Sequence, residues 1–240
     1  MRRAWRPRTD RSHFIDSGSM PSLFGSFDRT QLVALLATYG PMQIPEIAAA
    51  FNVNYSSALR RVRAAARTGL LERCRATADF YRVDPQHPIY GQIIRLARRL
   101  GRVYPLPVLK RRGEVHAVER VTPTREYNAI ETLGTRLSPM RGEILLLLFA
   151  LSEPIPINFI AGMLGRRRFS VCNAINAFET FGVVTCVRES RRRLVLLDRS
   201  WPAYRELHGL LAAIAQLDSQ WQEYAASYRS REGGRVSYNM

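Results

Sequence analysis

Residues 41–69, PMQIPEIAAAFNVNYSSALRRVRAAARTG, return in diverged form 113 residues later as PIPINFIAGMLGRRRFSVCNAINAFETFG, residues 154–182. The gapless shift pairs Pro41 with Pro154 and pairs Gly69 with Gly182. After one inserted residue, the pattern D-x-x-x-P-x-Y begins at both Asp84 and Asp198. Proline, glycine and aspartate do not belong to the apolar spacing that any two helices share, so the match indicates an internal duplication.

Each copy predicts three helices followed by a hairpin. Asp28 is expected to cap the first helix, Pro45 suits the first turn of the second, and Gly69 ends the third. The first copy gives helices at 29–39, 46–51 and 55–68 and strands at 70–75 and 80–84. The second copy gives helices near 139–151, 156–164 and 169–181 and strands at 183–188 and 193–198. This order is that of a winged helix-turn-helix.

The predicted fold class is therefore mainly α with small β wings (α+β), as tandem winged helix-turn-helix domains plus a long C-terminal helix. The 240 residues are enough for two such domains. The expected division is a basic N-terminal arm at 1–22, a first unit with a linker helix at 23–104, a linker at 105–132, a second unit with the long C-terminal helix at 133–229, and a tail at 230–240.

The net charge of +16 indicates a polyanionic partner, and most of the excess lies in three short segments, 1–11, 54–75 and 166–193. Lys110 is the only lysine among 36 basic residues. Arginines favour forked contacts to phosphate or guanine, but the preferred explanation of the bias is a GC-rich genome, whose codons favour arginine. The sequence has no apolar run long enough to cross a bilayer and no secretion signal, and its three cysteines form no disulfide framework. A cytoplasmic protein, associated with the nucleoid when bound to DNA, is expected.

Four short motifs resemble those of winged helix-turn-helix transcriptional regulators of the ArsR/MarR type. They are Leu23-Phe24-Gly25-Ser26, the Ile-Ala pairs at 47–48 and 160–161, Arg67-Thr68-Gly69-Leu70-Leu71, and Tyr81-Arg82-Val83-Asp84-Pro85. The resemblance covers about residues 23–104 and, more weakly, 133–217. It implies that the third helix enters the major groove and that the wing touches the DNA backbone. Most such regulators are homodimers of one unit, so a chain with two units departs from the pattern.

In the first unit, the third helix is expected to bury Leu59, Val62 and Ala66 and to turn a basic side outward, on which no acidic residue lies. Arg60 or Arg61 is expected to make a bidentate hydrogen bond to a guanine, and Arg63 and Arg67 are expected to contact phosphates. A solvated arginine-rich helix face is the alternative. The candidate DNA-binding residues of this unit, wing included, are Asn54, Tyr55, Ser56, Ser57, Arg60, Arg61, Arg63, Arg67, Arg73, Arg75 and Arg82.

The second unit presents different chemistry at the equivalent helix, where asparagines suit adenine and an arginine run suits phosphate. Its candidate DNA-binding residues are Arg166, Arg167, Arg168, Ser170, Asn173, Asn176, Arg188, Arg191, Arg192 and Arg193. If both helices read DNA, the two half-sites differ. The alternative is that the second unit has lost base reading and serves as an interaction domain. The five arginines of residues 1–11 form either an arm on the duplex or a solvated tail.

Catalytic and metal-binding signatures are not found. Cys74, Cys172 and Cys186 are interpreted as structural thiols, and no cysteine or histidine cluster has the spacing of metal ligands. The sequence also has no glycine-rich phosphate loop and no nucleophile elbow. We therefore expect no enzyme activity, no metal and no cofactor.

A heptad seam on the C-terminal helix predicts helix pairing. It consists of Leu207, Leu210, Ile214, Leu217, Trp221, Tyr224 and Tyr228. The helix expected over 88–104 has a similar seam, so the two pair within one chain, or the C-terminal helix pairs between chains. The preferred prediction is a homodimer through the C-terminal helix.

These observations predict a sequence-specific double-stranded DNA-binding transcriptional regulator, expected to act as a repressor. The alternatives are a plasmid or phage replication initiator or partition protein, and a winged-helix scaffold that binds protein.

Overall fold

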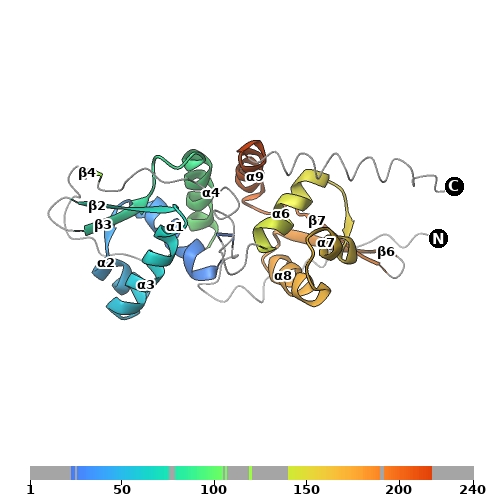
Figure 1. Cartoon of the computed structure of the whole chain (residues 1–240), viewed down its shortest axis with the longest axis horizontal. Coiled ribbons are helices and arrows are strands. Elements are labelled where there is room, and N and C mark those ends of the chain that lie inside the picture. Colours follow the sequence, from blue (N-terminus) through green and yellow to red (C-terminus); the bar gives the residue numbers. More distant parts are fainter. Residues whose placement is uncertain are drawn as a thin grey trace.

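The computed structural model describes residues 23, 24, 26–75, 79–104, 106, 119–120, 140–189 and 192–217. These residues are mainly helical, with eight helices and two small antiparallel sheets (Figure 1). The predicted mainly α class with small β elements is confirmed at this level. The arm at 1–22, the tail at 230–240 and nearly all of the linker at 105–132 lie outside the described residues.

The first copy runs from α1 to α4. Its elements are α1 (Phe27–Tyr39), β1 (Met42–Gln43), α2 (Ile44–Ala50), α3 (Tyr55–Ala66), β2 (Leu71–Arg75), β3 (Asp79–Val83) and α4 (Tyr90–Val103). The sheet has the order β1-β3-β2, with the two-residue strand β4 (Glu119–Arg120) at its edge. Antiparallel pairing joins Leu71 to Val83 and Met42 to Tyr81.

The second copy repeats this order. Its elements are α6 (Met140–Leu151), β5 (Ile155–Pro156), α7 (Ile157–Met163), α8 (Arg168–Thr180), β6 (Val184–Glu189), β7 (Arg192–Leu197) and α9 (Tyr204–Leu217). Its sheet has the order β5-β7-β6, and Val184 pairs with Leu197. The shift of 113 residues changes to 114 between β6 and β7, so the inserted residue lies in this hairpin.

Backbone hydrogen bonds also repeat at equivalent positions. Asp84 N–H donates to Leu70 O, and Asp198 N–H donates to Val183 O, each over 3.0 Å. The two aspartates then accept from the backbone N–H two residues later through their side chains. Gly69 and Gly182, which follow α3 and α8, have φ angles of 76° and 72°, which explains why glycine occurs in both copies. The duplication inferred from the sequence is therefore also a duplication of structure.

Local details correct two sequence expectations. The N-cap of α1 is Ser26 rather than Asp28, because the Ser26 hydroxyl accepts a hydrogen bond from Arg29 N–H over 3.1 Å. In α3 the buried residues are Ala58, Val62 and Ala65, whereas the predicted Leu59 and Ala66 are only partly buried. The core-facing side is thus displaced by about one residue from the expected one, and Val62 belongs to both.

The two copies are joined by α4 and α9, which pack against each other. Trp201 Nε1 donates to the Tyr104 hydroxyl over 3.2 Å, and Arg99 Nε donates to the Pro202 carbonyl over 2.9 Å. The Tyr104 hydroxyl also lies 3.4 Å from the Phe181 carbonyl oxygen, to which it donates. Buried apolar residues of both copies belong to one continuous core. The described residues therefore form one packed molecule with an internal pair of related units.

This packing changes the prediction for the C-terminal helix. Leu207, Leu210 and Ile214 are buried within the chain, since α9 packs on α4 and α6. They are not available to a second chain in this conformation, contrary to the expected seam between chains. Leu217 is 55% exposed, and Trp221, Tyr224 and Tyr228 lie outside the described residues.

Candidate nucleic-acid interface

Helices α3 and α8 lie along the same side of the molecule, the lower edge in Figure 1, and α4 and α9 lie at the opposite edge. Each is the third helix of its copy and follows a short helix and a tight turn. The turn before α3 contains Asn52 at φ 51°, and the turn before α8 contains the equivalent Gly165 at φ 58°. One side of the molecule therefore carries both helices that the sequence singled out.

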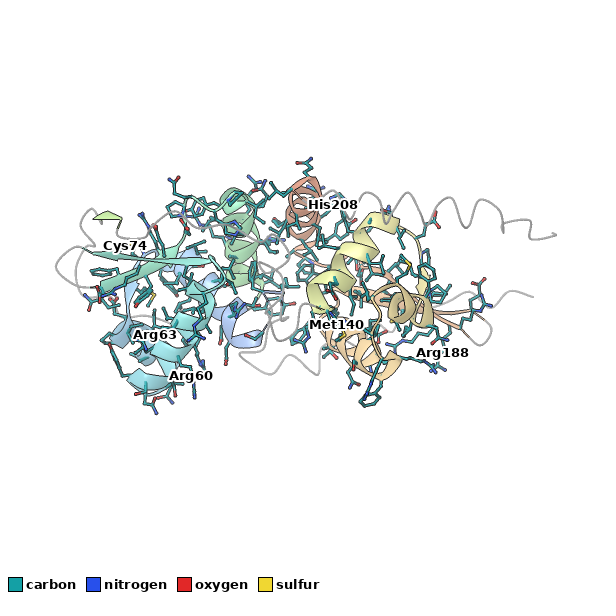
Figure 2. All side chains as sticks on the ribbon, viewed as in Figure 1. Arg60, Arg63, Cys74, Met140, Arg188 and His208 are labelled. Carbon is teal, nitrogen blue, oxygen red and sulfur yellow. The ribbon has the colours of Figure 1, made fainter. Side chains whose placement is uncertain are left out.

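The arginines of α3 and of its C-cap, Arg67, fall into two groups. Arg60, Arg63 and Arg67 are exposed, and their side chains have no ion pair or hydrogen bond within the described residues. Figure 2 shows Arg60 and Arg63 on the side of α3 away from α4 and α9. Arg61 differs, because its guanidinium lies 3.3 Å from the Asp28 carboxylate and 5.5 Å from the centre of the Phe51 ring. The expectation that this helix has no acidic partner is thus wrong for Arg61.

The remaining predicted residues at the start of α3 also divide into side chains with a partner inside the protein and side chains that are accessible. Asn54 is the N-cap, and its side-chain oxygen accepts from Ser57 N–H over 2.8 Å, so this side chain has a structural role. Tyr55 is 55% exposed and Ser56 is exposed, while Ser57 is partly buried. Tyr55 and Ser56 are therefore the accessible groups of the first turn.

Helix α8 begins in a run of exposed arginines. Arg167 is its N-cap and Arg168 its first residue, and the first turn contains no acidic residue. Arg166 lies 3.4 Å from the Glu143 carboxylate, while Arg167 and Arg168 have no acidic partner within the described residues. Cations at a helix N-terminus are destabilising, because they oppose the helix dipole and repel each other. Binding an anion would relieve this repulsion.

The outward side of α8 carries two asparagines in different settings. Asn173 is exposed and without a side-chain partner in the described part of the chain. Asn176 is also exposed, but its Oδ1 accepts from Arg193 Nη1 over 2.7 Å. Arg193 Nη2 donates to Glu179 over 2.6 Å, so this arginine bridges β7 and α8. Arg193 therefore holds Asn176 in place, whereas the sequence predicted that it contacts DNA. Ser170 is partly buried.

The hairpins contain a similar mixture of paired and accessible arginines. Arg73 pairs with Asp79, and its hydrogen bond to that carboxylate raises the pKa of Arg73. Arg82 lies directly opposite Glu72 in the strand pairing and donates to its buried carboxylate over 2.5 Å. Arg188 and Arg192 are exposed in the second hairpin, and Figure 2 shows Arg188 on that hairpin. The side chain of Arg75 and all of Arg191 lie outside the described residues.

The sequence reasoning missed Phe169, the second residue of α8, which is 74% exposed. The signal was present in the spacing. Phe169, Asn173 and Asn176 follow each other at i, i+4 and i+7, which places them on one face of a helix.

The described cysteines have the properties of structural thiols. Cys74 is buried, and burial raises its pKa. Burial likewise raises the pKa of Cys186 to about 11, so both remain protonated at neutral pH. No group of three or more histidine, cysteine, aspartate or glutamate side chains in the described ranges is arranged to hold a metal ion. Within those same ranges, no helix combines the length and hydropathy needed to cross a bilayer.

No protein-family model matches this chain, and a search of curated proteins found no match.

Proposed function

We propose that the chain is a sequence-specific double-stranded DNA-binding transcriptional regulator, built from two winged helix-turn-helix units and acting as a repressor. The observation that carries this proposal is the row of exposed arginines on α3, Arg60, Arg63 and Arg67, without acidic partners in the described part of the chain. Three guanidinium groups so placed repel one another unless an anion lies between them. A duplex supplies such anions at regular spacing.

The DNA contact proposed for each arginine of α3 follows from its position along the helix. In a helix-turn-helix, the N-terminal part of the second helix meets base edges and the rest of the motif meets the backbone. Arg60 is the first arginine along α3, so it is assigned to a guanine, with its fork donating to O6 and N7. Arg63 and Arg67, further along the helix, are assigned to phosphates. Arg61 positions the helix through Asp28 and Phe51 rather than reading DNA.

The second unit is proposed to contact the same duplex through α8. Arg167 and Arg168 lie at the N-terminus of α8, where helix dipole and arginine charge both favour a phosphate. Asn173 retains both the donor and the acceptor of its amide for an adenine. Because the outward residues of α3 and α8 differ, we propose an operator with two unlike halves. Occupying that operator would exclude polymerase, which is the basis for proposing a repressor.

A charge-matched pair of variants tests this proposal. The first, Arg60→Gln with Arg63→Gln and Arg67→Gln, removes three positive charges from α3. The second, Arg95→Gln with Arg102→Gln and Arg205→Gln, removes three from exposed positions on α4 and α9, at the opposite edge of the molecule. Binding to fragments of the source genome is measured by fluorescence anisotropy at one fixed salt concentration.

The α3 variant should bind at least about tenfold more weakly than the wild type, because several phosphate contacts are lost. The α4/α9 variant should lose much less. Equal losses in both variants would mean that only net charge matters, and the proposed interface would be wrong.

A further inference from the structure

We propose that Phe169 reads the C5 methyl group of a thymine in the major groove, which makes it a specificity-determining residue of the second unit. This inference rests on the proposed function, since it assigns one base contact within the interface described above. It concerns a residue that the charge pattern of the sequence did not reveal.

Phe169 is the second residue of α8, and its side chain is 74% exposed. Helix α8 turns Val171, Ala174, Ile175 and Phe178 toward the core, and the opposite side carries Phe169, Asn173 and Asn176. The ring is thus the first group on the outward stripe of this helix, directly after Arg166, Arg167 and Arg168.

Burying a phenylalanine side chain is stabilising, and this chain obtains little of that stabilisation from Phe169 in its present conformation. The first unit shows a related feature, because Tyr55, the first residue of α3, is 55% exposed. Both helices therefore start with an exposed aromatic ring, and the ring of α8 directly follows three arginines in the sequence. An exposed apolar ring at the end of an arginine run fits a partner that offers both negative charge and a small apolar group.

A phenyl ring has no hydrogen-bond donor or acceptor, so it cannot distinguish bases by their polar edges. In the major groove the apolar group on offer is the C5 methyl of thymine, which phenylalanine can contact. The neighbouring arginines would hold the phosphates on either side, and Asn173 would reach a base one helical turn away from the ring. The ring would therefore select thymine over cytosine, which shares the pyrimidine shape but lacks the methyl group.

Deoxyuridine tests this contact, because it differs from thymidine only by the absence of that methyl. A duplex selected from a randomised library with the full chain is resynthesised with each thymine replaced in turn by deoxyuridine. At one thymine the wild type should lose about fourfold in affinity, the value of one buried methyl group. The Phe169→Ala variant should bind the thymine duplex and the deoxyuridine duplex with equal affinity at that position, because it lacks the ring that contacts the methyl group. Leu217→Ala, which truncates another exposed apolar side chain away from α8, should keep the wild-type dependence.

Two results would overturn the inference and are distinguishable. If the library yields a preferred duplex but Phe169→Ala keeps the wild-type deoxyuridine profile, or no thymine matters, the assignment of Phe169 is wrong and the proposed function stands. If the wild type selects no duplex at all, the proposed function fails and this contact fails with it. Because Phe169 is exposed, the alanine variant should retain the wild-type unfolding midpoint, which a thermal melt verifies.

Discussion

Arg192 and Arg193 are neighbours on β7 but have different surroundings. Arg192 is exposed, whereas Arg193 is tied to Asn176 and Glu179. Under the proposed function we predict that Arg192→Ala weakens binding to all duplexes alike, because the substitution would remove a contact to the DNA backbone. Arg193→Ala should instead change the ranking of duplexes, because Asn176 loses its orienting hydrogen bond. Competition titrations with specific and unrelated duplexes measure both effects, and identical profiles for the two variants would refute the distinction.

His87 couples the stability of the first unit to pH. Its side chain is buried, and its Nδ1 accepts from Ile89 N–H over 3.3 Å. Burial lowers the pKa of His87 from 6.5 to about 4, although the Asp84 carboxylate opposes the shift. Since the folded pKa is depressed, the unfolded chain takes up the proton first as the pH falls. The contribution that neutral His87 makes to the free energy of unfolding is therefore fully present above pH 6.5 and is lost as the pH falls toward 4.

We therefore predict that the free energy of unfolding falls by about 3 kcal/mol between these two pH values through this residue. Denaturant melts of the wild type and of His87→Gln over that range measure it, because the substituted chain lacks the titration. His208→Gln, at an exposed histidine on α9, is the matched control and should keep the wild-type dependence. A His87→Gln chain with an unchanged pH profile would refute the prediction.

Helix α4 approaches α1 closely at Gly101. A methyl group there would lie 2.9 Å from the Thr38 hydroxyl and 2.7 Å from Leu106 Cδ1. At Gly209 in α9, a methyl group would have no described neighbour within 4 Å. Both substitutions gain the helix propensity of alanine, so their difference isolates the packing. We predict that Gly101→Ala is less stable than Gly209→Ala by about 1–3 kcal/mol in chemical unfolding. Equal stabilities would show that α1 and α4 can separate without penalty.

The order of helices and hairpins was predictable from sequence because apolar spacing, proline and glycine repeat in both copies. The strands β1 and β5 were missed because two residues have no periodicity. The pair Arg82–Glu72 depends on the register of β2 with β3, which the spacing alone does not give. The hydrogen bond from Arg193 to Asn176 joins a residue of β7 to a residue of α8. It depends on how these two elements pack, so only the folded structure reveals it. Sequence thus located the arginine-rich surface but did not separate paired from accessible arginines.

At the scale of the whole molecule, Tyr104 and Trp201 hold the two units together. Both are buried, and the Tyr104 hydroxyl accepts from Trp201 Nε1 and donates to the Phe181 carbonyl. We predict that Tyr104→Phe destabilises the chain by about 1–3 kcal/mol, since it leaves a buried indole N–H without an acceptor. Tyr204→Phe, which removes a hydroxyl with no hydrogen bond within the described residues, should change the stability little. Circular dichroism during urea unfolding compares them, and equal midpoints would contradict the proposed role of the hydroxyl.

Under the proposed function, exposed arginines of both units hold one DNA duplex. Measuring the affinity for a genomic duplex fragment as a function of salt concentration tests whether they do. Each phosphate neutralised contributes about −0.9 to the slope of log affinity against log salt concentration. Contacts from α3, from the start of α8 and from the hairpins predict a slope of several units, roughly −4 or steeper. Affinity that does not depend on salt, or no binding to any genomic fragment, would contradict the account.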